Sequence, residues 1–251
     1  MGPRLRGRDE LGAVTPAHAG VLPSLASDRS GEMYVELIDA LRCPRPHPEG
    51  TTDTWLVAAA RRSSGRCIVD GVLGCPVCRA EFPIAGGVAD FGAPRDIDPP
   101  AAAAPAPDAT ADALRLAALL DLASPGGIVA VGGDWDAALD GLADLTDVRA
   151  LVVEPAHAYA PREPFGALVG GELPVAAGAL RGVALDARTA TPARLTAAVR
   201  ALRPAGRLVA PAGVPAPDGM RELARDAAHW VAERAPGRDA APAGLVPLRR
   251  R

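Results

Sequence analysis

The residues best suited to chemistry in this sequence are its four cysteines, at positions 43, 67, 75 and 78. Cys75 and Cys78 are separated by two residues, a spacing that lets both thiolates point at one metal ion. Upstream, Cys43 and His47 form a Cys-x3-His pair that can supply one thiolate and one imidazole. Cys43, His47, Cys75 and Cys78 together predict a closed, tetrahedral zinc site. Its role would be structural, because a catalytic zinc keeps one position open.

Cys67 competes with His47 to be the fourth ligand. It lies in an apolar run typical of a strand and has no partner at the same spacing, so we favour His47. A further alternative leaves Cys43 and Cys67 as small buried residues and makes Cys75 and Cys78 a redox pair. Metal binding is the favoured interpretation, because a core of about sixty residues is marginal without a cross-link. Cytoplasmic chains also keep their thiols reduced.

The element that must position these ligands is residues 33–92, a zinc-ribbon module with a short helix near 36–41 followed by strands. Residues 1–32 are rich in Pro, Gly, Ser and Arg without periodicity, which predicts a disordered N-terminal extension. Residues 93–109 are rich in Pro and Ala and predict a semi-stiff linker. Two ordered units are therefore expected, and the second occupies residues 110–251.

Residues 110–251 alternate short apolar runs with helical patterns. This alternation predicts an α/β fold, a Rossmann-like and mostly parallel, doubly wound sheet of about seven strands. The expected strands are 127–132, 149–154, 167–170, 182–186 and 207–210, with 229–234 and 244–249 as a closing hairpin. The expected helices are 111–123, 136–145, 191–202 and 218–227.

Three motifs in residues 35–91 carry a family resemblance. They are LIDALRCP at 37–44, GCPVC at 74–78 and EFPIAGGV at 81–88. In order and spacing they resemble the small zinc-ribbon activators of tRNA and protein methyltransferases. The sequence departs from that family in its Cys-x3-His pair and in a longer insert between the ligand pairs. The resemblance implies a module that binds and solubilises a methyltransferase.

The second unit resembles a class I S-adenosylmethionine-dependent methyltransferase. The motifs are IVAVGGD at 128–134, ALVVE at 150–154, VALD at 183–186 and ALRPAGRLV at 201–209. The resemblance implies S-adenosylmethionine as a candidate cofactor. Its implied binding residues are Gly132, Gly133 and Asp134 in the loop after the first strand, Glu154 at the ribose and Asp186 beside the site.

The cofactor loop itself departs from the family pattern. Gly132 matches, but the next two glycine positions carry Asp134 and Asp136, and Ala130 replaces the acidic residue before the loop. Asp134 or Asp136 is expected to cap the following helix instead. We therefore expect a non-catalytic or weakly active scaffold or regulatory subunit. The alternative is an active methyltransferase that carries its activator in the same chain.

Composition narrows the possible partners. All 27 basic residues are Arg and the chain has no Lys, Asn or Gln, which excludes a Walker phosphate loop and Schiff-base chemistry. The net charge of −3 argues against a dedicated nucleic-acid binder. No apolar run reaches the roughly 20 residues of a membrane span, and no secretory signal opens the sequence, so a cytoplasmic protein is expected. The ribbon and the Rossmann-like unit are expected to contact each other, and the scaffold interpretation implies a protein partner.

Overall fold

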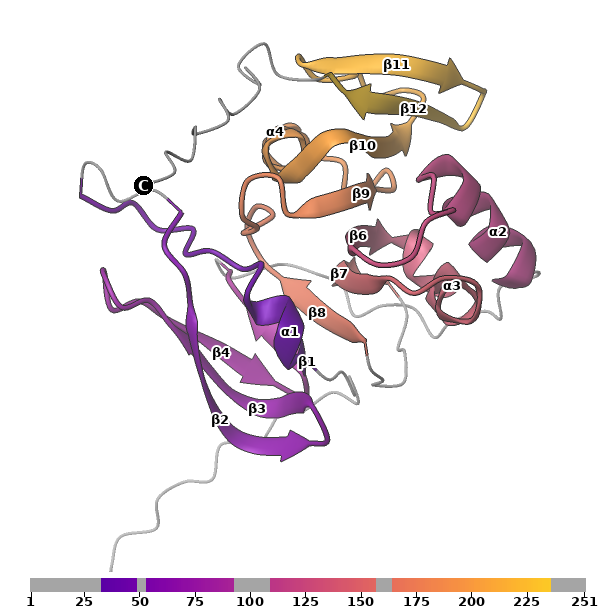
Figure 1. Cartoon of the computed structure of the whole chain (residues 1–251). Coiled ribbons are helices and arrows are strands. Elements are labelled where there is room, and N and C mark those ends of the chain that lie inside the picture. Colours follow the sequence, from indigo (N-terminus) through magenta and orange to yellow (C-terminus); the bar gives the residue numbers. More distant parts are fainter. Residues whose placement is uncertain (1–32, 49–52, 93–108, 157–163, 236–251) are drawn as a thin grey trace, which may run out of the picture.

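The structure is a computed structural model that describes residues 33–48, 53–92, 109–156 and 164–235. These residues form one sheet of twelve strands with helices on both of its faces (Figure 1). The expected extension 1–32, most of the expected linker and the expected strand 244–249 lie outside the described residues. None of the described helices is long and apolar enough to span a membrane.

The N-terminal unit, residues 33–92, is called the ribbon below after the sequence-based expectation, and it is built around a central strand, β3. Its elements are β1 (Met33–Tyr34), α1 (Val35–Ile38), β2 (Val57–Ser64), β3 (Cys67–Gly74), β4 (Glu81–Ala85) and β5 (Val88–Asp90). Strand β3 pairs antiparallel with β2 along its whole length, and also with β1 and β4. This arrangement places the ends of β2, β3 and β4 close to the segments that carry the cysteines.

The second unit is a Rossmann-like sheet of seven strands, as expected. Its order is β8-β7-β6-β9-β10-β12-β11; the first five strands run parallel, and β12 is antiparallel to both of its neighbours. The strands are β6 (Ile128–Gly133), β7 (Arg149–Pro155), β8 (Phe165–Val169), β9 (Leu180–Ala184), β10 (Leu202–Pro211), β11 (Met220–Arg225) and β12 (His229–Arg234). The helices are α2 (Ala109–Leu119), the 3-10 helix η1 (Asp134–Ala138), α3 (Leu139–Leu145) and α4 (Pro192–Ala201).

The central strands form because both of their faces are buried. In β6, Val129 and Val131 belong to the hydrophobic cluster that contains α2 and α3, whereas Ala130 belongs to the cluster that contains α1 and α4. Successive side chains of a strand point to opposite faces, so a continuous apolar run fills two cores. The helices lie accordingly, α2 and α3 on one side of the sheet and α1 and α4 on the other (Figure 1).

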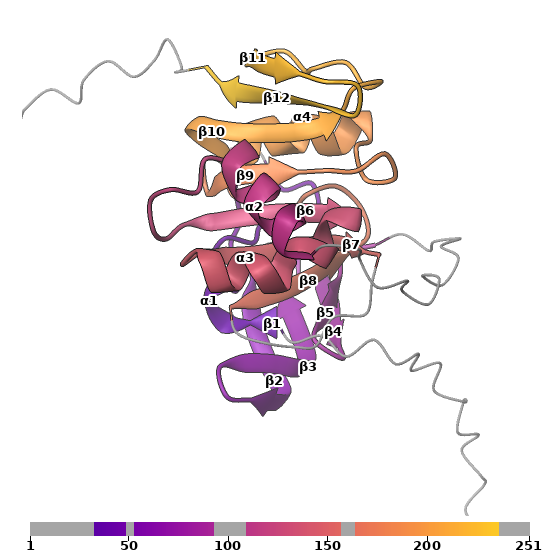
Figure 2. The ribbon, with the colours of Figure 1, turned by 90° about the vertical axis from the view of Figure 1, so that its right-hand side faces the viewer.

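The ribbon and the Rossmann-like unit share this sheet. Strand β5 pairs in parallel with β8, with Val88 opposite Ala167 and Asp90 opposite Val169. Figure 2 shows the strands stacked in one continuous ladder from β11 to β2. One hydrophobic cluster also contains residues from both units. The sequence predicts a ribbon followed by a separate sheet. The structure instead contains one sheet to which both units contribute strands.

Two expected helices differ from the structure. Residues 220–225 form strand β11, whereas the sequence favoured a helix over 218–227. Met, Glu, Leu, Ala and Arg are good helix formers, so the sequence predicts a helix here. In the structure β11 pairs along β12 instead, and it takes the place of 244–249 as the second strand of the closing hairpin. The expected helix 136–145 begins earlier, as the 3-10 turn η1, and becomes α-helical only from Leu139.

Candidate functional site

Cys43, His47, Cys75 and Cys78 come together at one end of the ribbon. Their ligand atoms all lie within 4.8 Å of one another. The Sγ atoms of Cys43 and Cys78 are 3.7 Å apart, and His47 Nε2 lies 3.2 Å from Cys75 Sγ. A tetrahedral zinc ion with bonds of about 2.3 Å holds its sulfur ligands about 3.8 Å apart. Three sulfurs and one imidazole nitrogen at this spacing fit zinc, so the cluster could hold that ion.

Backbone hydrogen bonds fix the loop that carries Cys75 and Cys78. The Cys75 amide donates to the carbonyl of Ala80 and the Arg79 amide donates to the carbonyl of Cys75, both at 2.9 Å. The Cys78 amide points at Cys75 Sγ, 3.5 Å away. Amides that donate to a sulfur stabilise its thiolate form, which is the form that binds metal. The loop geometry therefore favours the thiolate form of Cys75.

Thr54 supports the other two ligands. Its carbonyl accepts a hydrogen bond from the Cys43 amide at 2.9 Å, and its Oγ1 lies 3.5 Å from Nδ1 of His47. Since His47 Nε2 faces Cys75, the nitrogen toward Thr54 is the one that does not face the cluster. A partner on the outer nitrogen fixes the orientation of a ligand histidine. Thr54 thus holds the imidazole ready for a metal ion.

The thiols of Cys43 and Cys75 differ in acidity. Burial raises the pKa of Cys43 to about 12. Burial also acts to raise the pKa of Cys75, but hydrogen bonds from the Cys78 amide, the His47 ring and the Val77 amide outweigh it and lower the pKa to about 6. Cys75 is therefore the more acidic of the two thiols, and metal binding would require Cys43 to give up its proton.

Cys67 does not take part in this cluster. It is fully buried in β3, where it pairs with Tyr34 of β1. Among the described residues, the grouped ligands are the three other cysteines and His47. The structure thus brings together the set that the spacing favoured. Cys67, the alternative fourth ligand, is a buried core residue instead.

The residues expected at the cofactor lie at the carboxyl ends of neighbouring parallel strands. Gly132 and Gly133 end β6, and Asp134 follows directly in η1. Glu154 lies near the end of β7, and Asp186 follows β9. The order of the sheet reverses between β6 and β9, the place where open α/β sheets bind their ligands. All five residues therefore lie at the carboxyl edge of the parallel strands β7, β6 and β9.

The glycine loop, however, is packed against the turn that follows β9. Gly133 has φ +65°, and a Cβ on it would lie 1.9 Å from the Asp186 carboxylate. A Cβ on Gly132 would lie 2.7 Å from Thr189 Oγ1. The Asp186 carboxylate accepts hydrogen bonds from the Asp134 amide at 3.2 Å and from the amide and hydroxyl of Thr189 at 2.8 and 2.6 Å. Both glycines are needed for this contact, which already engages Asp186.

Glu154 is held in a largely buried ion pair with Arg194 of α4. Glu154 Oε1 lies 3.3 Å from Arg194 Nη2, and the two side chains are 12% and 7% exposed. The same oxygen accepts the amide of Gly170 at 2.8 Å. Arg194 also donates to the carbonyls of Thr189 and Gly171, both at 3.0 Å. The carboxylate expected at the ribose is thus engaged by partners within the protein.

The sequence argument missed Arg194. It lies on the buried face of α4, together with Ala198 and Ala201. An arginine on the apolar face of a predicted helix was the available signal, because a buried guanidinium requires an acidic or carbonyl partner.

The expected capping role of Asp134 or Asp136 is corrected by the structure. The N-cap positions of η1 and α3 are Gly133 and Ala138, and neither makes a side-chain capping hydrogen bond. Asp136 is buried, and its Oδ2 accepts the amide of Ala156 at 2.7 Å. Asp136 therefore ties η1 to the end of β7.

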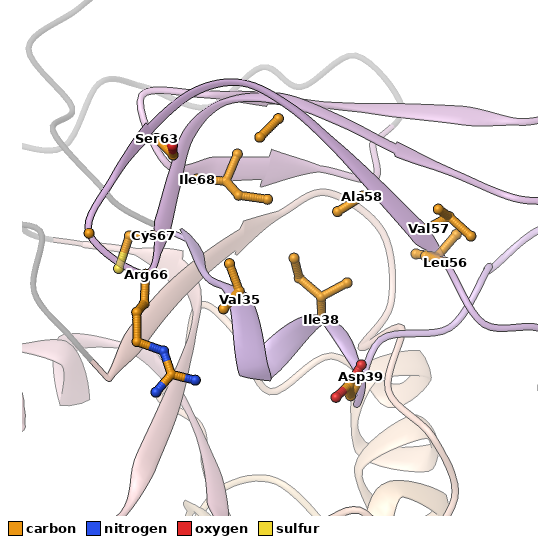
Figure 3. A pocket seen from close by; sticks show the side chains of 12 residues that line it. Val35, Ile38, Asp39, Leu56, Val57, Ala58, Ser63, Arg66, Cys67 and Ile68 are labelled. Atoms are coloured by element: carbon orange, nitrogen blue, oxygen red, sulfur yellow. The ribbon is translucent and has the colours of Figure 1, made fainter.

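Cavities lie in both units of the described part of the chain. One of about 410 Å³ lies beside the glycine loop, between α2, η1 and the start of β12. The other, of about 560 Å³, lies in the ribbon between α1 and the β2–β3 hairpin (Figure 3). Its lining is mostly apolar and includes Val35, Ile38, Leu56 and Ile68.

No protein-family model and no curated protein sequence matches the chain. Solved methyltransferase structures are similar to it. The antibiotic-resistance methyltransferase Kmr is 18% identical with a TM-score of 0.34, over 50% of this chain and 93% of Kmr. Geranyl diphosphate C-methyltransferase from Streptomyces coelicolor A3(2) is 14% identical with a TM-score of 0.33, over 40% of this chain and 42% of that one.

A putative S-adenosyl-L-methionine-dependent methyltransferase from Methanococcus maripaludis is 9% identical with a TM-score of 0.38, over 52% of this chain and 87% of that one. Against another geranyl diphosphate methyltransferase, the match spans only 48% of that protein's length. Each of these methyltransferase structures is similar to about half of this chain or less, at low sequence identity. The Cys/His cluster described above could hold zinc.

Proposed function

We propose that this chain is a non-catalytic, methyltransferase-like protein that acts as a scaffold or regulatory subunit. The observation that supports this proposal is the buried ion pair between Glu154 and Arg194. A carboxylate at this strand end binds a nucleoside by accepting hydrogen bonds from ribose hydroxyls. Here Glu154 Oε1 already accepts hydrogen bonds from Arg194 and from the Gly170 amide. A ribose hydroxyl would have to compete with these two partners for the carboxylate.

The loop after β6 gives independent support. Ala130 is fully buried and offers no carboxylate to the amino group of a methionine moiety. Asp186 accepts three hydrogen bonds from the protein and leaves little capacity for a ligand. With Asp134 and Asp136 at the positions where the family has glycines, the backbone also cannot approach a cofactor closely. Each element of the expected cofactor site therefore has another role in the fold.

Zinc has a structural role in this proposal. When bound, the ion would cross-link the Cys43–His47 segment to the loop of Cys75 and Cys78. Four protein ligands complete a tetrahedral shell, so no position remains for a substrate. The ribbon then presents a stable strand, β5, to the edge strand β8 of the Rossmann-like sheet.

Calorimetric titration with the cofactor tests whether the protein binds it. We expect zinc-loaded protein to give no binding heat with S-adenosylmethionine or S-adenosylhomocysteine, because Glu154 and Asp186 are engaged internally. Micromolar binding that Glu154→Gln abolishes, in a variant with an unchanged unfolding curve, would overturn the proposal. That result would favour the alternative, an active methyltransferase that carries its activator in the same chain.

We further propose that the ribbon and the Rossmann-like unit stay associated without a covalent link. We expect that cutting the chain at a protease site inserted within 93–108 leaves the two fragments in one complex during gel filtration, because β5–β8 pairing and a shared core join them. A second site placed before Met33 is the matched control, since cleavage there does not separate the two units. Two fragments that elute separately and folded would contradict this prediction.

A further inference from the structure

The three cysteines of the Cys/His cluster differ in their access to solvent. Cys75 is buried, with 3% of its surface exposed, and Cys43 is half-buried, whereas Cys78 is exposed. Cys78 belongs to the segment 76–79, in which every residue is exposed. Oxidants in solvent react with thiolates according to their exposure. Cys78 is therefore the sulfur of the cluster that a small oxidant reaches first.

The Cys78 sulfur faces a second thiol from a distant part of the chain. Cys43 lies 35 positions earlier, and its Sγ is 3.7 Å from Cys78 Sγ. A disulfide has a bond of about 2.05 Å, so a bond between these two sulfurs requires only a short approach. A thiol that coordinates a metal ion is deprotonated, so both sulfurs are thiolates when the cluster holds zinc. The pair is placed to form a disulfide.

Cys75 is the poorer partner for Cys78. Its Sγ lies 3.2 Å from His47 Nε2 and 3.5 Å from the Cys78 amide nitrogen. Contacts of this kind stabilise a thiolate and so make it a weaker nucleophile. Cys67 is fully buried and lies outside the cluster. Of the four cysteines, Cys43 is thus the one best placed to react with an oxidised Cys78.

We propose that Cys43 and Cys78 form a hydroperoxide-sensitive pair whose oxidation releases zinc. The Cys78 thiolate attacks one oxygen of hydrogen peroxide, the O–O bond breaks, and the products are a sulfenic acid and a hydroxide. The Cys43 thiolate then attacks the oxidised sulfur, the S–O bond breaks, and a second hydroxide leaves as the disulfide forms. Two thiolates together lose two electrons, and the peroxide gains them.

The disulfide replaces the metal as the cross-link of the ribbon. Cys43 lies on the segment after α1 and Cys78 on the turn between β3 and β4, so a Cys43–Cys78 bond joins the same two segments as the ion. His47 and Cys75 alone cannot complete a tetrahedral shell. Zinc is therefore released while the ribbon stays closed. This inference goes beyond the scaffold role, because it makes the metal content depend on peroxide and rests on the cluster alone.

Treatment of the full-length, zinc-loaded protein with hydrogen peroxide tests the pair. We expect loss of one zinc ion per chain, measured with a chromophoric chelator, and loss of two of the four thiols. Trypsin cuts after arginine but not before proline, so it places Cys43 in peptide 43–61 and the other cysteines together in peptide 67–79. A non-reducing digest should contain these two peptides joined through Cys78. Far-UV circular dichroism should stay unchanged.

Three results would overturn the proposal: a disulfide between Cys75 and Cys78, oxidised thiols without a disulfide, or zinc retained under excess peroxide. Two variants then test the role of Cys43. Cys43→His keeps a metal ligand and removes the attacking thiol, so its zinc-loaded form should release zinc more slowly and give no joined peptides. Cys67→Ala is the matched control and should react as the unaltered chain does, because Cys67 is buried outside the cluster. Equal rates of zinc release from the two variants would refute the pair.

Discussion

A protein with serine in place of both Cys75 and Cys78 is expected to lose its zinc and to unfold the ribbon. The ribbon holds about sixty residues, a size at which a single core is marginal without a cross-link. Structural zinc contributes roughly 10–16 kcal/mol of apparent binding free energy in small ribbon-like domains. We expect zinc content to fall from one ion per chain to none. Hydrogen exchange in β3 and β4 should then approach the rate of an unfolded chain.

The chain contains a matched control for this experiment. Cys67→Ala also removes a thiol from β3, but Cys67 is fully buried and outside the ligand cluster. This variant should keep its zinc and lose only about 1 kcal/mol, the usual size of a modest core substitution. Verified metal loss from the double serine variant without a change in circular dichroism or melting temperature would contradict the zinc-dependent ribbon.

Unfolding of the ribbon should also destabilise the Rossmann-like unit that follows residue 92. Strand β8 pairs with β7 on one edge and with β5 on the other, so unfolding of the ribbon leaves one edge of β8 unpaired. An open edge with the buried residues Ala167 and Leu168 is a surface on which chains associate. Because the two units share one sheet, we expect bound zinc to stabilise both.

Parts of this architecture could be read from the sequence because the physical signal is local. The runs at 128–133 and 150–153 contain no polar side chain, as is typical of parallel strands buried on both faces. The candidate zinc ligands could be identified for the same reason, since two residues between Cys75 and Cys78 let both sulfurs point at one ion. The Cys-x3-His spacing favours His47 over Cys67 as the fourth ligand, and the structure groups His47 with Cys43, Cys75 and Cys78.

Other parts depend on contacts between distant segments. Strand β11 has helix-forming residues, and only its partner β12 makes it extended. Strand β5 has three residues, too few for a pattern, yet it connects the ribbon to the main sheet. Similarly, Glu154 could be picked out as a strand-end carboxylate, but its partner Arg194 lies 40 residues further along the chain. Nothing local links the two.

Replacing Arg194 by methionine is the second substitution with a large expected effect. Arg194 and Glu154 are 7% and 12% exposed, so the variant leaves a buried carboxylate without its cation. We expect the free energy of unfolding in urea to fall by about 3–5 kcal/mol. Arg203→Met is the matched control, because Arg203 is exposed and its replacement should change stability by no more than about 0.5 kcal/mol.

A double-mutant cycle separates the pair from its other contacts. Glu154→Gln keeps an acceptor for the Gly170 amide and removes the charge, so its combination with Arg194→Met should cost less than the sum of the two single changes. A coupling of about 1–3 kcal/mol is expected for a buried pair in direct contact. Additive effects would mean that Glu154 and Arg194 do not interact energetically. In that case the Glu154 carboxylate is available to a ribose, and the main support for a cofactor-free protein is lost.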